Sequence, residues 1–305
     1  MKFTNKYNWP KAYVDAVLND TYDKGYADIS ITGLLAPPRI RVLSKLHDHE
    51  MEEDVSNRTF ILMGQVMHGI LERANTVALA EKRFYIEIDG LTISGQSDAV
   101  YLDGLIQDWK LTSVYQVRDG AKLEFEQQLN CYAYLVKHGY YHIDNDPEKD
   151  KVHLNVTVNR LENFVLLRDW SRGKAKRERN VPQAGGGIYE VSVWTEEETL
   201  AFIKERIALH RAANKKLPLC TMHEMWGEPE KWAVMVKGKK TSLKNHLKKE
   251  DAEQHAARVG AKVEYRPDKR TRCTDGYCLV AKYCTQYRQY LEKLKQTKTK
   301  AKKGK

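Results

Sequence analysis

The chain has 305 residues, of which 42% are hydrophobic and 30% are charged. This composition is typical of a folded globular protein, and it excludes collagen-like and intrinsically disordered classes. Lys and Arg together number 51 against 41 Asp and Glu, which gives a formal net charge of +10. The positive charge favours a polyanionic partner such as nucleic acid, although many folded proteins carry similar charge without binding DNA.

The sequence contains no membrane or export signal. No apolar run approaches the ~20 residues of a transmembrane helix, and residues 1–15 lack the apolar core of a signal peptide. We therefore expect a cytoplasmic protein that makes no membrane contact. The five cysteines are an odd number in a reducing compartment, which argues against a disulfide framework.

The first half of the chain predicts a helix, an antiparallel meander and a second helix. Apolar residues recur at helical spacing over residues 60–80, and a second helix is expected over residues 122–138. Segments of strand composition lie between the two helices, at residues 84–88, 91–94, 99–102 and 105–109. Asp-Gly pairs at 89–90 and 103–104 separate neighbouring segments, and this pair is typical of tight hairpin turns.

The second half predicts more strands and a long helix. Further strands are expected at residues 152–159, 163–170 and 188–194. Residues 160–162 would join the first two of these strands. A glycine run at residues 185–187 predicts a flexible joint. A helix is expected over residues 196–216. The order of these elements predicts an α/β fold, a mixed sheet flanked by helices.

Composition also divides the chain into three expected parts. A core with its N-terminal approach segment would span residues 1–217, and a Cys-containing region with a strand at 232–236 would span residues 218–292. Residues 293–305 contain seven Lys and no acidic residue. Such a composition predicts a disordered basic tail that adds non-specific affinity for nucleic acid.

Polar residues with metal-binding chemistry recur in the predicted core. His68 lies on the first helix, Asp98 ends the sequence GQSD on a strand, and Asp108 and Lys110 lie two residues apart on the next strand. Residues i and i+2 share a strand face, and the hairpin can bring Asp98 close to Asp108. Two carboxylates and an imidazole suit Mg²⁺ or Mn²⁺. A neighbouring lysine can position a water next to a phosphate, so the set has the parts that metal-assisted phosphodiester hydrolysis requires.

The order of these four residues, followed by a Gln-x-x-x-Tyr sequence on the second helix, resembles the PD-(D/E)XK nuclease superfamily in its RecB-like branch, close to exonucleases of bacteriophages. The likeness covers about residues 60–170. The resemblance implies a core with the restriction-endonuclease-like fold. It also implies a deoxyribonuclease that depends on Mg²⁺ or Mn²⁺, namely an exonuclease that acts in DNA recombination, repair or phage replication. The implied partners are linear duplex or single-stranded DNA ends, together with a single-strand annealing protein or a helicase.

The roles that the resemblance implies fall on six residues. They are His68, Asp98 and Asp108 as metal ligands, Lys110 as the catalytic lysine, and Gln128 and Tyr132 as the polar pair that supports it. Each residue type alone is common on ordinary helices and strands. The alternative is therefore a non-catalytic DNA-binding or scaffold protein that keeps the nuclease fold.

Four cysteines of the C-terminal region form a second candidate metal site. They are Cys220, Cys273, Cys278 and Cys284, the last three with the spacing C-x4-C-x5-C. Thiolates suit Zn²⁺ or iron–sulfur clusters, and the resemblance implies a [4Fe–4S] cluster, which RecB-like nucleases often carry. This sequence departs from their pattern, in which the first step is C-x2-C and the single distant Cys often precedes the core. A cluster, Zn²⁺ and four ordinary reduced thiols all remain open.

Basic residues that follow the predicted core strands are candidates for DNA contact. Five of the eight positions from 172 to 179 are basic, namely Arg172, Lys174, Lys176, Arg177 and Arg179. In a DNA nuclease such a run contacts backbone phosphates, whereas in other proteins it is an ordinary solvated loop. Trp109 and Tyr115 lie near the predicted site and are candidates for base stacking, with core packing as the simpler expectation for Trp109.

Overall fold

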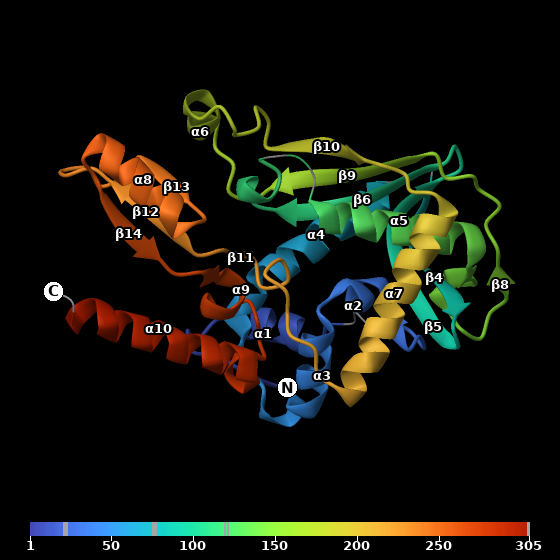
Figure 1. Cartoon of the computed structure of the whole chain (residues 1–305). Coiled ribbons are helices and arrows are strands. Elements are labelled where there is room, and N and C mark those ends of the chain that lie inside the picture. The colour runs from blue at the N-terminus through green and yellow to red at the C-terminus, as the bar shows by residue number, and fades with distance from the viewer. Residues whose placement is uncertain (21–23, 75–77, 119, 121, 304–305) are drawn as a thin grey trace. The chain divides into compact units, whose positions relative to one another are not determined.

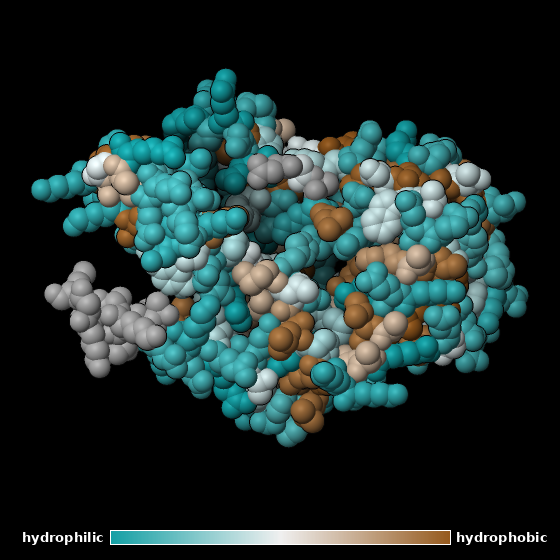
Figure 2. Space-filling model, viewed as in Figure 1, coloured by the Kyte–Doolittle hydropathy of each residue, from teal (hydrophilic) through white to brown (hydrophobic). Residues whose placement is uncertain are grey.

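The structure is a computed structural model of the chain, and it describes residues 1–20, 24–74, 78–118, 120 and 122–303. Two compact units are present. Unit 1 comprises Met1–Ala36 and Glu52–Lys215, and unit 2 comprises Pro37–Met51 and Lys216–Lys305. No described helix is long and apolar enough to cross a membrane. The face in Figure 2 is mostly hydrophilic, with small and separate hydrophobic patches.

Unit 1 is built on a mixed sheet. Its strands are β2 (Ile29–Ser30), β4 (Ala78–Ile88), β5 (Leu91–Tyr101), β6 (Leu105–Thr112), β7 (Tyr140–His142), β8 (Lys151–Val152), β9 (Arg160–Leu167) and β10 (Gly186–Val191). They lie in the order β10-β9-β6-β5-β4-β7-β8, with β2 paired to β5 (Figure 1). Strands β4, β5 and β6 are antiparallel neighbours, whereas β6 and β9 are parallel. The chain therefore crosses over between β6 and β9, which requires a long connection.

Two glycine-containing turns fix the register of the β4–β5–β6 meander. Asp89 and Gly90 join β4 to β5 with φ angles of 50° and 69°, which are the two positive angles of a type I′ hairpin turn. Gly104 precedes β6 with a φ of 96°, and a Cβ atom there would lie 2.4 Å from the carbonyl oxygen of Thr157. Only glycine fits this position. Both hairpins predicted from the Asp-Gly pairs are thus confirmed.

Helices cover both faces of this sheet. The helices of unit 1 are α1 (Lys11–Leu18), α2 (Ile31–Leu35), α4 (Thr59–Ala74), α5 (Leu123–His138), α6 (Arg172–Arg177) and α7 (Glu196–Lys215). Helices α2, α5 and α7 form the main core, in which Leu135 and Ile207 share one hydrophobic cluster with Ile106 of β6 (Figure 1). Met67 of α4 packs with Trp109. Strand side chains alternate between the two faces, so Ile106 and Trp109, three residues apart, point to opposite faces. Ile106 packs with α5 and Trp109 packs with α4, and the two helices therefore lie on opposite sides of β6.

The expected bounds of the core elements need three corrections. The first helix ends at Ala74, and residues 78–80 belong to β4 because they pair with β5. Residues 75–77 of that prediction lie outside the described part. The strand expected at 152–159 is limited to the short β8, and residues 153–159 have no regular structure. Residues 160–162 begin β9 instead of forming a turn, because their backbone pairs with β6.

The region after β9 also differs from the expectation. Gly186 and Gly187, expected as part of a flexible joint, belong to β10 and pair with β9. The basic segment after residue 170 contains the short helix α6, which Ser171 caps by accepting a hydrogen bond from the backbone of Lys174. The long helix predicted over 196–216 is confirmed as α7.

Unit 2 joins a short N-terminal helix to the C-terminal residues. Its elements are α3 (Pro38–Leu46), β11 (Gly227–Glu228), β12 (Lys231–Met235), β13 (Lys244–His246), α8 (Lys249–Val259), β14 (Lys262–Arg266), β15 (Lys269–Arg270), α9 (Thr271–Thr274) and α10 (Thr285–Lys303). Strand β12 confirms the strand predicted near residue 232, and α8 packs on its sheet through Ala252 and Val234. Leu43 and Met51 bury themselves against Val280 and Cys284. This packing assigns residues 37–51 to unit 2, although the sequence placed them in the core.

The basic C-terminal segment is helical. We expected residues 293–305 to be disordered, but α10 continues through Lys303, and residues 304–305 of that prediction lie outside the described part. Its first turns are anchored by Tyr290, which is buried and donates a hydrogen bond to the carbonyl oxygen of Asp268. Lys has good helix propensity, so a helix that is anchored in this way can extend into the Lys-rich segment.

Candidate active site

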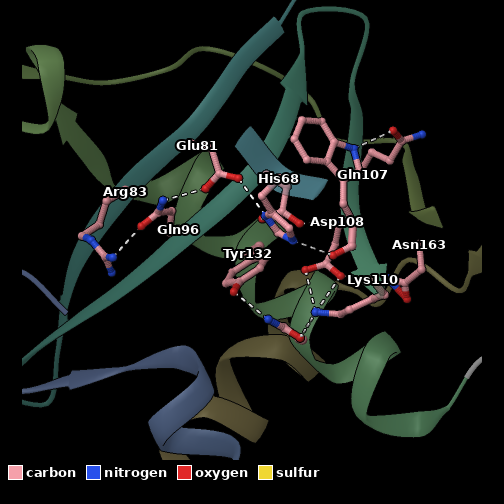
Figure 3. A network of polar contacts seen from close by, with 12 residues as sticks. His68, Glu81, Arg83, Gln96, Gln107, Asp108, Lys110, Tyr132 and Asn163 are labelled. Atoms are coloured by element: carbon pink, nitrogen blue, oxygen red, sulfur yellow. Dashed lines mark hydrogen bonds and ion pairs between the residues drawn. The ribbon is translucent and has the colours of Figure 1, made fainter. Parts of the chain in front are cut away.

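A cleft of about 1400 Å³ in unit 1 gathers the predicted site residues. It is lined by side chains from α4, β4, β5, β6 and α5, among them His68, Asp98, Asp108, Lys110 and Gln128. These residues are far apart in the sequence, and the antiparallel meander and the two helices bring them together. The close-up in Figure 3 shows them as one polar network.

Asp108 and Lys110 form the centre of this network. They lie two residues apart on β6, and the Lys110 Nζ atom is 2.8 Å from Asp108 Oδ2 and 3.0 Å from Gln128 Oε1. The Asp108 side chain is almost fully buried, and the amide nitrogen of Asn163 on the neighbouring β9 lies 3.4 Å from it. The lysine is thus held between a carboxylate and an amide oxygen, with its ammonium group at the cleft (Figure 3).

Ala99 of β5 is paired with Gln107 of the antiparallel strand β6. The next residues on the two strands, away from the hairpin turn, are Asp98 and Asp108, so these two residues lie opposite each other. Asp98 is buried, and it accepts a hydrogen bond of 2.5 Å from the backbone N–H of Trp109. Burial and the negative charge of Asp108 raise the pKa of Asp98 to about 8, although His68 and Lys110 act in the opposite direction. Two carboxylates in this position repel each other until a cation or a proton neutralises one of them.

His68 approaches Asp98 from α4. Its Nε2 atom lies 3.0 Å from the carbonyl oxygen of Trp109, and its Nδ1 atom lies 2.8 Å from Glu81 Oε1 and 3.6 Å from Asp98 Oδ1. Burial alone would lower the pKa of His68, but the hydrogen bond to Glu81 and the charges of Asp98 and Glu81 raise it to about 9. The bond to Trp109 requires a proton on Nε2. The nitrogen that faces the carboxylates, and that can bind a cation, is therefore Nδ1.

Glu81 completes a group that the sequence predictions did not contain. Among the described residues, the one group of three or more potential ligand atoms within 4.8 Å of one another comprises His68, Glu81 and Asp98. The other Glu81 oxygen accepts a hydrogen bond of 2.7 Å from Gln96, whose own oxygen accepts one of 2.6 Å from Arg83 (Figure 3). Glu81 has a φ of 49°, an unusual angle for a non-glycine residue in a strand.

The expected ligand set is therefore changed in one position. We expected Asp108 beside His68 and Asp98, whereas the compact group holds Glu81, and Asp108 forms an ion pair with Lys110. No sequence signal indicated Glu81, because the predicted first helix ended just before it. Its position depends on the β4–β5 pairing and on its own backbone angle.

The supporting residues of α5 lie as predicted. Gln128 donates a hydrogen bond of 2.7 Å to the Tyr132 hydroxyl group while its oxygen accepts from Lys110. The Tyr132 ring lies against Gly95, where an added Cβ atom would be 2.8 Å from the ring. Gly95 thus lets α5 approach the sheet closely, which explains the glycine in the GQSD sequence.

The donor set fits a hard divalent cation. Glu81 and Asp98 offer carboxylate oxygens and His68 offers a nitrogen, with Asp108 directly beside Asp98. Mg²⁺ and Mn²⁺ prefer such oxygen-rich sites. A cation here would also relieve the repulsion that keeps Asp98 protonated.

The remaining candidates fall into two groups. Trp109 is buried between β6 and α4, as expected for core packing, whereas Tyr115 is exposed. The five basic residues of the 172–179 segment are all exposed, on α6 and in the turn after it. They are free to meet an external polyanion.

The four cysteines of unit 2 line one small cavity. Cys220, Cys273, Cys278 and Cys284 meet there, and no two are joined by a disulfide bond. Burial raises the pKa of Cys220 to about 12 and that of Cys273 to about 11. The Arg39 Nε atom donates to Cys284 Sγ at 3.1 Å. The structure thus places all four residues of this second candidate site at the same cavity.

Comparisons with known proteins add little to this picture. No protein-family model and no curated protein matches the chain. Seven chains of solved structures are similar to it. One of them, titled "Crystal structure of SSO0001", has 15% sequence identity and a TM-score of 0.40, over 65% of this chain and 83% of that chain. This similarity is too low to support a fold assignment. The mixed α/β architecture is therefore described from the structure of the chain alone.

Proposed function

We propose that the protein is a metal-dependent deoxyribonuclease that hydrolyses phosphodiester bonds of DNA. The observation that carries this proposal is the convergence of Asp98, Asp108, Lys110 and His68 in one cleft from separate elements. The cleft has a volume of about 1400 Å³, and the net charge of +10 favours a polyanionic substrate. The resemblance of the motif order to RecB-like nucleases supports the same function.

The residues of the cleft have separate roles in this proposal. His68 Nδ1, Glu81 and Asp98 would hold Mg²⁺ or Mn²⁺, with Asp108 available beside them. When bound, the cation supplies charge neutralisation of the phosphate and acidifies a bound water. The backbone carbonyl oxygen of Trp109 orients the histidine by accepting a hydrogen bond from Nε2–H.

Lys110 would act on the reacting phosphate. Its ammonium group is oriented by Asp108 and Gln128, and Tyr132 in turn orients Gln128. A lysine that is positioned before the substrate arrives stabilises the negative charge that develops on the phosphate oxygens and orients the attacking water. The hydrogen-bonded chain from Tyr132 to Lys110 supports this preorganisation.

The direct test is incubation of the purified protein with end-labelled linear DNA and with closed circular DNA, with Mg²⁺, with Mn²⁺ or with EDTA. We expect degradation of the linear form only, and no degradation in EDTA. Cutting of closed circles would change the exonuclease part of the proposal to an endonuclease. Intact linear DNA in both metals, with DNA binding retained, would favour the alternative of a non-catalytic DNA-binding protein.

We also propose that the four thiols of unit 2 hold a [4Fe–4S] cluster. Four soft thiolate ligands around one cavity suit either a cluster or Zn²⁺. The resemblance to RecB-like nucleases, which often carry a [4Fe–4S] cluster, supports the cluster. Metal analysis of protein purified without oxygen decides between iron with sulfide and zinc.

A further inference from the structure

Two exposed aromatic rings lie at the edge of the sheet next to Lys110. Phe60 begins the exposed side of α4, lines the cleft and is 52% exposed. Tyr115 lies in a short 3-10 turn, η3 (Val114–Gln116), and is 70% exposed. Exposed aromatic rings next to positive charges are the groups on which single-stranded nucleic acids stack their bases.

An arginine guanidinium group lies over each of the two rings. The Arg168 guanidinium carbon lies 3.9 Å from the centre of the Phe60 ring, and that of Arg118 lies 5.5 Å from the centre of the Tyr115 ring. Both distances are within the range of cation–π contacts. Each pair thus presents a flat apolar surface next to a positive charge.

Backbone contacts hold the two pairs at the same edge of the sheet. β6 and β9 are parallel, so their carboxyl ends meet. The Arg168 N–H donates to the Thr112 carbonyl oxygen at 2.9 Å, and the Val114 N–H donates to Asp169 at 2.7 Å. Tyr115 follows Lys110 by five residues, which can span at most about 17 Å. The rings are therefore within a few nucleotides of the candidate catalytic lysine.

The charge of the surrounding surface restricts the class of partner. The chain leaves this edge directly into the basic α6 segment, whose five Arg and Lys side chains are exposed. Rings that alternate with cations suit a polyanion with flat apolar groups, which describes a nucleic acid whose bases are unpaired. In a duplex the bases are already stacked on each other, so their faces are not available.

We propose that Phe60 and Tyr115, each with its arginine, form a stacking surface that binds single-stranded DNA beside the active site. The inference deepens the proposed nuclease function, on which it rests, because it defines the substrate as a strand that is unpaired where it enters the cleft. Phosphates of this strand would contact Arg118, Arg168 and the α6 segment.

Binding of a short fluorescent oligonucleotide in EDTA tests this surface without any cleavage. We expect Tyr115→Ala and Phe60→Ala each to weaken single-strand binding by about 5-fold or more, the lower limit for loss of one stacked base. Binding of a duplex of the same sequence should change less than about twofold, because its bases are not available for stacking. Tyr115→Phe and Phe60→Tyr keep an aromatic ring and should restore binding.

A matched control and a spectroscopic signal separate stacking from general damage. Tyr7, which precedes α1, is 69% exposed, almost the same as Tyr115. Tyr7→Ala should leave binding unchanged. An oligonucleotide containing 2-aminopurine should lose fluorescence on binding to the wild-type protein, because stacking quenches this base, and should keep more of it with Tyr115→Ala.

The outcomes separate this inference from the nuclease proposal. Unchanged single-strand binding in both alanine variants, or equal losses for duplex and single strand, would overturn the stacking surface. DNA hydrolysis in Mg²⁺ by the wild-type protein would survive that result. Conversely, ring-dependent single-strand binding without any hydrolysis would overturn the nuclease proposal and leave the stacking surface in place.

Discussion

The cleft of unit 1 and the cysteine cavity of unit 2 both gather candidate metal ligands, but they have opposite chemistry. The cleft is wide, and its ligand atoms are carboxylate oxygens and a ring nitrogen in contact with other charges. The cysteine cavity is small, and burial raises the pKa of Cys220, Cys273 and Cys278, which favours their protonated form in the absence of metal. An open charged site lets a cation and a substrate exchange, whereas a closed thiol site binds its metal as part of folding.

This difference predicts that variants of the two regions fail in different assays. A change in the cleft should affect hydrolysis while the fold stays intact. A change in the cysteine cavity should affect the stability of unit 2. Four experiments follow, from the largest expected effect to the smallest.

The largest effect is expected for the Asp108–Lys110 pair. Lys110→Ala and Asp108→Ala should each lower the hydrolysis rate by at least about 100-fold, because each removes a group that acts on the transition state. Lys110→Ala should still fold, with a lower thermal midpoint because the buried Asp108 loses its ion-pair partner. Rates from single-turnover cleavage of labelled DNA measure the effect. Full activity of Lys110→Ala would show that the cleft is not the active site.

The next effect concerns the cysteine cavity. Cys278→Ala should abolish the visible absorption of protein purified without oxygen and lower its thermal midpoint, because cluster binding also stabilises the fold. Cys131→Ala is the control, since Cys131 is buried in the core of unit 1 and lies outside the set of four. Visible absorption should survive in that variant. Colourless wild-type protein without bound metal would mean that the four thiols are ordinary reduced cysteines.

A smaller effect is expected for Glu81. Glu81→Gln should weaken Mn²⁺ binding by about 10- to 100-fold, because it removes one charge from the His68–Glu81–Asp98 group and disturbs the bond that orients His68. Glu72→Gln is a matched control, since Glu72 lines the same cleft and is exposed. Calorimetric titration with Mn²⁺ measures both variants. Equal affinities in the two variants would contradict a role for Glu81 in metal binding.

The smallest effect is a pH dependence of stability in the metal-free protein. Asp98 has a pKa of about 8 against 3.8 for an ordinary Asp, so the folded protein binds more protons than the unfolded chain between these values. His68 has a pKa of about 9 against 6.5, so its stabilisation is complete below about 6.5 and is lost as the pH rises through 9. Both groups lower the free energy of unfolding as the pH rises.

The measurement is the thermal midpoint between pH 6.5 and pH 9, with EDTA or with Mn²⁺. The midpoint should fall with rising pH in EDTA, and Mn²⁺ should reduce the fall because the cation replaces the protons. Asp98→Asn should show a shallower slope than the wild type in EDTA. A midpoint that rises with pH in EDTA would have the wrong sign for this arrangement.

Local sequence signals were sufficient for the parts of the site that lie within one element or one hairpin. The spacing of Asp108 and Lys110 predicted their shared face, and the turn glycines predicted the hairpin that sets Asp98 beside Asp108. Gln128 was assigned from the resemblance to RecB-like nucleases, through its Gln-x-x-x-Tyr spacing on a predicted helix. These features depend on the strand and helix repeats, which are visible in a single sequence.

Features that depend on distant contacts were not predicted. Glu81 approaches His68 through strand pairing and a positive φ angle, neither of which has a composition signal. The Arg39 contact with Cys284 joins residues 245 positions apart. The strand bounds after residue 150 were wrong because pairing with β6, and not local propensity, decides where β9 begins.

The assignment of residues 37–51 to unit 2 has a consequence for synthesis of the chain on the ribosome. Leu43 and Met51 pack against Val280 and Cys284, but 164 residues separate Met51 from Lys216, where the rest of unit 2 begins. At about 5–20 residues per second, this interval takes roughly 10–30 s. During that time the apolar side of α3 has no native partner, while the strands of unit 1 emerge and can pair. Unit 2 therefore completes its fold last, and a chain interrupted after residue 215 leaves Leu43 and Met51 exposed to chaperones or aggregation.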